Sequence, residues 1–153
     1  MLIRGSFDPS GSPIISIGIT GPTGSRRYDA TIDTGFTGLF VMNVGEMVPL
    51  GLKTVGATDV TLADGRTVPD LMAEASVTLG AATKIATILL SETSNDVFVG
   101  LDFLRTFRLA LIMTATAVIL YDEAEALVAV FRALSGAPMG TPNTAPNFRP
   151  GGL

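Results

Sequence analysis

The feature that most restricts the fold of this 153-residue sequence is an apolar alternation with a period of two, broken by turn signals. Because successive side chains of a strand point to opposite faces, such an alternation is typical of half-buried β-strands. The run at 14–19 is followed by a turn rich in glycine, proline and serine, and then by a second run at 28–33. The residues on the apolar faces are Ile15, Ile17 and Ile19 in the first run and Tyr28, Ala30 and Ile32 in the second. The pattern predicts a mainly β protein.

A hairpin is predicted at 59–68, where Asp64-Gly65 lies between two extended arms. Asp-Gly favours hairpins because both positions of a two-residue turn want positive φ. Two further strands are expected at 73–80 and 84–90.

The segment that follows combines a short apolar run with a helical signal. Residues 96–100, "DVFVG", predict a strand buried on both faces, and 101–107 predict one short helix capped by Asp102. A closing hairpin is expected at 109–122. Residues 1–122 are therefore expected to form one β-rich domain.

The sequence changes character twice after this domain. Asp122 and Glu125 have the spacing of a capping box, and an apolar stripe at helical spacing predicts an amphipathic C-terminal helix over 123–135. The stripe, formed by Leu127, Val130, Phe131 and Leu134, is expected to pack against either the core or a partner subunit. Residues 136–153 hold four prolines and four glycines and are expected to form a flexible tail.

Composition limits the possible functions. The net charge is −4 with ten scattered basic residues, so no basic face for nucleic acid is expected. The longest charge-free apolar stretch, 109–121, is shorter than the ~20 residues that span a bilayer, and the first residues do not read as a secretory signal, which favours the cytoplasm. The sequence has no histidine and no cysteine, so any acid–base chemistry must come from carboxylates, lysine or tyrosine. We expect no metal and no cofactor.

The candidate catalytic residue is Asp33, which follows an apolar strand and precedes Thr34 and Gly35 in "YDATIDTGFTGLF". Taken alone, an Asp-Thr-Gly tripeptide most often begins an ordinary Asx turn. A second segment, "DVFVGLDFL", changes this interpretation. Together the two segments resemble the retropepsin-like aspartic proteases, single-domain relatives of a pepsin half, over about residues 12–122. Bacterial and ubiquitin-shuttle-associated members are especially similar.

This resemblance implies a half-pepsin acid protease fold, in which the segment around Phe98 to Gly100 crosses beneath the Asp-Thr-Gly loop. It also implies an aspartic endopeptidase, in which two carboxylates activate a water against an extended peptide or protein substrate. The sequence has one Asp-Thr-Gly, so the second carboxylate is expected from a second copy in a C2 homodimer. The resemblance assigns Thr34 a hydrogen bond across the dimer, and assigns Gly35 backbone groups for carboxylate and substrate.

Two features depart from the family pattern. Phe36 stands where the family usually has alanine or serine, which alters the expected shape of nearby subsites. The predicted flap, with Ala63, Asp64 and Gly65 at its tip, is less glycine-rich than retroviral flaps, and its alternative is a plain solvent-exposed turn. The alternative function is a non-catalytic dimerisation or peptide-binding module with the protease fold. A part of a larger polyprotein is a third possibility.

Overall fold

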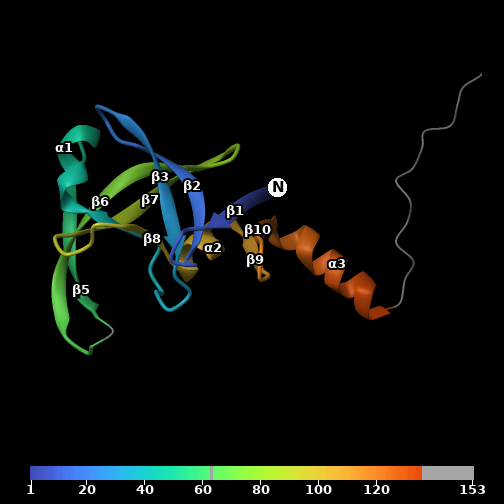
Figure 1. Cartoon of the computed structure of the whole chain (residues 1–153). Coiled ribbons are helices and arrows are strands. Elements are labelled where there is room, and N and C mark those ends of the chain that lie inside the picture. The colour runs from blue at the N-terminus through green and yellow to red at the C-terminus, as the bar shows by residue number, and fades with distance from the viewer. Residues whose placement is uncertain (63, 136–153) are drawn as a thin grey trace, which may run out of the picture.

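A computed structural model describes residues 1–62 and 64–135 of the chain (Figure 1). Strands dominate these residues, as the sequence predicts. The strands are β1 (Leu2–Phe7), β2 (Pro13–Thr20), β3 (Ser25–Ile32), β4 (Phe40–Asn43), β5 (Thr54–Thr61), β6 (Thr67–Leu79), β7 (Ala82–Ser91), β8 (Val97–Val99), β9 (Leu109–Met113) and β10 (Val118–Asp122). The helices are the 3₁₀ turn η1 (Val44–Glu46), α1 (Met47–Leu50), α2 (Leu101–Phe107) and α3 (Glu123–Ser135).

The strands form one sheet that folds back on itself. Their order is β5-β6-β7-β4-β8-β3-β2-β1-β10-β9, and the long strand β6 pairs with β2 as well as with β5 and β7. The second pairing of β6 closes the sheet around a single core. The largest side chains that are fully buried in this core include Phe40, Phe103, Ile15, Ile17, Ile19, Met42 and Leu50.

The short strand β8 lies between β3 and β4, and this arrangement positions the site. It pairs in parallel with β3, where Thr31 is opposite Phe98, and antiparallel with β4, where Val41 is opposite the same Phe98. The chain runs from β3 to β4 before β8 returns between them. The crossing expected from the family resemblance is therefore present.

The structure confirms most of the predicted strands and corrects three details. The hairpin at 59–68 is present, but its last paired residues are Thr61 and Thr67, so five residues connect the arms. The expected two-residue turn is wrong, and the return arm and the strand expected at 73–80 form one strand of 13 residues. The sequence did not predict β1 or β4. Positions along β1 alternate only between exposed and half-buried, which gives the apolar pattern little contrast.

Two helix starts differ from their predicted capping. Asp102 does not cap α2, because the helix begins at Leu101 and Gly100 occupies the cap position. The Asp102 carboxylate instead accepts a hydrogen bond from Arg105 Nη1 at 2.8 Å. At α3, Asp122 Oδ1 accepts from the Ala124 N–H at 3.1 Å, but Glu125 contacts the N-terminal ammonium at 3.5 Å rather than completing the box.

Helix α3 extends away from the sheet (Figure 1). Its apolar stripe does not pack against the core, since Leu127, Phe131 and Leu134 are 63%, 73% and 83% exposed. The prediction that the stripe packs against the core is therefore wrong. Its packing against a partner subunit stays a prediction. No helix among residues 1–62 and 64–135 is long and apolar enough to cross a bilayer. The predicted tail at 136–153 and Ala63 lie outside the described residues.

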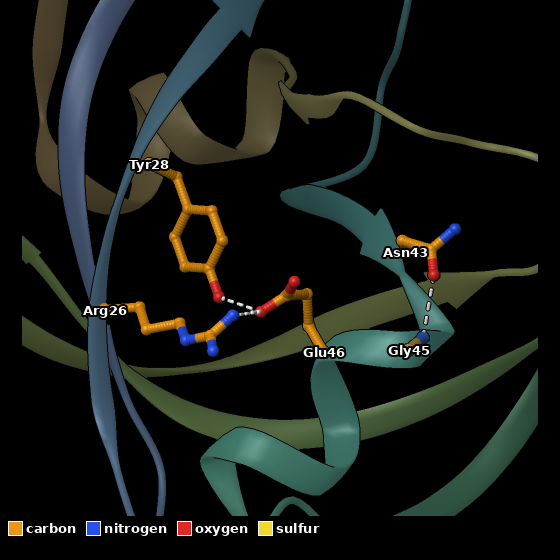
Figure 2. Close-up of polar contacts among 5 residues, drawn as sticks. All are labelled: Arg26, Tyr28, Asn43, Gly45 and Glu46. Carbon is orange, nitrogen blue, oxygen red and sulfur yellow. Dashed lines mark hydrogen bonds and ion pairs between the residues drawn. The ribbon is translucent and has the colours of Figure 1, made fainter.

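A partly exposed cluster of polar side chains ties the segment after β4 to β3 (Figure 2). Glu46 Oε2 accepts hydrogen bonds from Tyr28 Oη at 2.6 Å and from Arg26 Nη1 at 2.9 Å. Burial, and after it the hydrogen bond to Glu46, raises the pKa of Tyr28 well above its usual range. Three residues before Glu46, Asn43 caps η1: its Oδ1 accepts a hydrogen bond from the Gly45 N–H at 2.8 Å.

Replacing Glu46 by glutamine tests this cluster. Because the Arg26 and Glu46 side chains are 50% and 26% exposed, and glutamine can still accept from Tyr28, E46Q should lower the free energy of unfolding at neutral pH by no more than about 1 kcal/mol. The pKa of Tyr28 should fall but stay above that of a free tyrosine, because burial remains. Ultraviolet titration of phenolate formation measures the pKa. Both proteins should carry Y121F, since the chain has two tyrosines. An unchanged Tyr28 titration would contradict the assigned cause.

Candidate active site

Asp33 lies directly after β3, at the point where the chain leaves the sheet. Its main-chain N–H donates to the Val99 carbonyl at 2.9 Å, so the strand hydrogen bonding to β8 continues one residue beyond β3. Its side chain is exposed, and Oδ1 accepts from the Gly35 N–H at 2.9 Å. The carboxylate is thus oriented by its own loop and is exposed to solvent.

Thr34 and Gly35 complete the tight turn and are exposed. The Phe36 N–H donates to the Asp33 carbonyl at 3.2 Å, which closes the turn. A Cβ on Gly35 would lie 3.2 Å from Asp33 Oδ1, tighter than ordinary contact. A side chain at Gly35 would therefore press on the carboxylate that its N–H holds.

The loop after the turn is fastened to the start of α2. The Leu101 N–H donates to the Phe36 carbonyl at 2.9 Å, and the Gly100 N–H donates to the Leu39 carbonyl at 3.2 Å. Gly100 has no room for a side chain, because a Cβ there would clash with the carbonyl oxygens of Phe36 and Gly38. The Asp33 loop is thus packed backbone to backbone against Gly100.

The Phe36 ring occupies space left by two glycines. A Cβ on either Gly38 or Gly100 would clash with this ring, so the ring lies against both backbones and is half-buried. The bulky residue that departs from the family pattern is accommodated inside its own loop. Its predicted contact with substrate stays a prediction.

The predicted flap is an exposed hairpin. Gly65 has φ of +83°, which favours glycine, and its N–H donates to the Leu62 carbonyl at 2.9 Å. Asp64 Oδ2 accepts from Arg66 Nε at 2.7 Å, and Oδ1 accepts from the Arg66 N–H at 3.0 Å. These hydrogen bonds from Arg66 lower the pKa of Asp64.

A cavity that the sequence analysis missed lies on the Asp33 side of β3. It has a volume of about 480 Å³, and its walls include Phe7, Asp8, Asp29, Thr31, Asp96 and Phe98. Along β3 and its next residue, one face carries Asp29, Thr31 and Asp33. The other face carries Ala30 and Ile32, which point into the core. The alternation in "YDATID" predicts that Asp29 and Thr31 share a face. It does not predict that Phe98 joins them in the cavity wall, because this depends on the pairing of β3 with β8.

Comparison with protein-family models and with curated proteins gave no match. Solved structures, however, match over most of the chain. A retropepsin-like aspartic protease from Rickettsia conorii aligns with a TM-score of 0.56 at 16% identity, covering 78% of this chain and 90% of the other. EIAV protease complexed with the inhibitor HBY-793 aligns with a TM-score of 0.57 at 14% identity, covering 70% of this chain and 98% of the other.

The fold is retropepsin-like. This agrees with the fold predicted from "YDATIDTGFTGLF" and "DVFVGLDFL". The retropepsin-like fold explains why the two motifs lie together: β8 must pass beside β3 for the Val99 carbonyl to reach the Asp33 N–H.

The backbone packing at Gly100 can be tested with alanine. Because the added methyl group would meet backbone oxygens that cannot rotate away, G100A should lower the free energy of unfolding by about 1–3 kcal/mol or more. Gly18 is the matched control, since a Cβ there would lie 3.5 Å from Thr78 Cβ in ordinary contact. Urea unfolding should show G18A within about 1 kcal/mol of wild type. Equal losses in both variants would contradict the packing described here.

Proposed function

We propose that the protein is an aspartic endopeptidase that works as a homodimer. The observation that carries the proposal is the Asp33 carboxylate, which is exposed and held by the Gly35 N–H inside a retropepsin-like fold. An exposed carboxylate with one oxygen fixed and one free can bind and activate a water. The matched solved structures are described as proteases, which supports the same chemistry for this chain.

Hydrolysis needs two carboxyl groups, and the chain has one Asp-Thr-Gly. In the proposed C2 dimer the two Asp33 side chains meet on the axis and share one proton, because adjacent like charges cannot both remain ionised. The ionised carboxylate takes a proton from water, whose oxygen attacks the peptide carbonyl carbon, while the protonated carboxyl donates to the carbonyl oxygen. Collapse of the tetrahedral intermediate breaks the C–N bond after the amine is protonated.

The remaining predicted site residues have roles in the same proposal. Thr34 hydrogen bonds to the other subunit and fixes the two loops, and Gly35 offers backbone groups to the substrate. The hairpin tip, with Ala63, Asp64 and Gly65, covers an extended peptide that binds as an added strand, and Phe36 shapes a nearby subsite. A bacterial source and a cytoplasmic location, as predicted from the sequence, belong to the proposal.

Replacing Asp33 by asparagine tests the catalytic assignment. The amide has the shape of the carboxyl group and removes like-charge repulsion, so D33N should fold and dimerise at least as well as wild type. Cleavage of a proteome-derived peptide library, read by mass spectrometry, should fall by more than about 1,000-fold, since a positioned acid or base contributes about 10²–10⁴-fold. Peptide binding without cleavage in both proteins would favour the non-catalytic module. Cleavage by D33N near the wild-type rate would exclude Asp33 as the catalytic group.

Mixing the two proteins tests whether one site needs two chains. When wild-type and D33N chains exchange freely in equal amounts, about a quarter of the dimers hold two aspartates, by the statistics of a C2 pair. Activity per wild-type chain should therefore fall to about half. Subunit exchange is verified by native mass spectrometry, and an unrelated protein replaces D33N in the control. Constant activity per wild-type chain under verified exchange would show that each Asp33 acts without a twin.

A further inference from the structure

Asp70 is a carboxylate in an unusual position on β6, the return strand of the proposed flap. It is 7% exposed and takes an inward position on the strand, as the apolar Val68 does two residues earlier. A buried polar group normally has hydrogen-bond partners. Within residues 1–62 and 64–135 no hydrogen bond to the Asp70 carboxylate is found, and no side-chain oxygen is both fully enclosed and unpartnered, so the carboxylate oxygens of Asp70 are open to solvent.

The carboxylate borders a cavity of about 320 Å³. Val68, Pro69, Leu71 and Leu90 give the cavity apolar walls, and Asp70, Ser91, Glu92 and Thr93 give it polar ones. The two hydroxyl groups contact one another, with Ser91 Oγ and Thr93 Oγ1 3.2 Å apart, and Ser91 Oγ also accepts from the Thr93 N–H at 3.3 Å. Among the described residues, therefore, two acidic side chains border the cavity and no basic side chain does.

The electrostatics of the cavity favour a positively charged occupant. Burial, and after it the negative charge of Glu92, raises the pKa of Asp70. Each of these effects opposes ionisation of Asp70, and a cation beside the carboxylate would offset both. A bound N–H donor would also donate hydrogen bonds to the carboxylate oxygens.

The mixed walls distinguish between kinds of cation. Lysine and arginine bury their methylene stems along apolar surface while the charged end stays in a polar environment. The described residues hold no group of three or more acidic, histidine or cysteine side chains that could ligate a metal ion. A long aliphatic chain with a cationic end therefore fits the apolar walls and two carboxylates of this cavity better than a bare metal ion does.

We propose that this cavity binds the ammonium or guanidinium group of a lysine or arginine side chain of the substrate. The proposal rests on the peptidase function proposed above. Asp70 lies four residues after Arg66 at the hairpin end, or about 13 Å along an extended strand. Glu92 and Thr93 lie in the connection that leads into β8, whose Val99 carbonyl binds the Asp33 N–H. The cavity thus borders the return strand of the proposed flap and the start of the connection that leads to the segment beneath the catalytic loop.

A binding experiment tests the cavity without requiring catalysis. The probe is n-pentylammonium, which mimics a lysine side chain, titrated into the D33N protein and followed by amide chemical shifts. Saturable shifts are expected at residues 69–71 and 91–93, and n-pentanol, the neutral probe of similar length, should cause none there. The double variant D70N/E92Q should lose these shifts, whereas E74Q, which alters an exposed acid on the same strand, should keep them.

Peptide cleavage tests the assignment to substrate. A positional-scanning library should show a preference for lysine or arginine at one position, and D70N/E92Q should reduce it by about tenfold or more, as expected for hydrogen bonds to a charged group. E92Q alone provides a second variant should D70N fail to fold. Absence of ammonium binding, or binding that D70N/E92Q leaves unchanged, would overturn the proposed cavity site. Cleavage without a basic preference would overturn the assignment to substrate. If no peptide is cleaved although the probe binds, the peptidase function fails and the cation site stands.

Discussion

The hydrogen bond from the Asp33 N–H to the Val99 carbonyl connects the two halves of the site. It places the carboxylate at the end of a strand whose neighbour comes from much later in the chain. The same short strand, β8, also holds β4 on its other side, so the loop between β3 and β4 is fixed at both ends. Gly100 then lets the backbone of that loop approach without a gap. The orientation of Asp33 depends on this crossing.

Local sequence patterns predict those strands and helices in which one face is apolar and the other polar. β2, β3 and α3 follow from apolar periodicity, and the crossing follows from the two motifs that resemble a known family. β1 and β4 were not predicted, because one has little apolar contrast and the other has only four residues. Their strand character comes from pairing with distant segments, which a local pattern does not encode.

The candidate site could be predicted only in part for the same reason. Asp33, Thr34 and Gly35 are contiguous in the sequence, so their turn can be recognised directly. Asp70 and Glu92 lie on different elements, and the cavity between them exists because β6 and β7 pair. The capping role predicted for Asp102 failed because Gly100 occupies the cap position of α2, where its backbone and that of Leu101 bond to the Asp33 loop. The apolar stripe of α3 identified a helix correctly but did not reveal which surface covers it.

The crossing of β8 also has a consequence for how the protein folds. Contacts between residues far apart in sequence are slow to form, because the intervening chain must first lose the entropy of an open loop. The hairpins β2–β3 and β6–β7 pair neighbouring segments and can form early. The Asp33 loop cannot be held in place until β8 has inserted between β3 and β4. A nascent chain that has emerged only as far as β7 therefore carries its Asp-Thr-Gly on an unanchored loop, and the arrangement that orients the carboxylate forms only in the nearly complete domain.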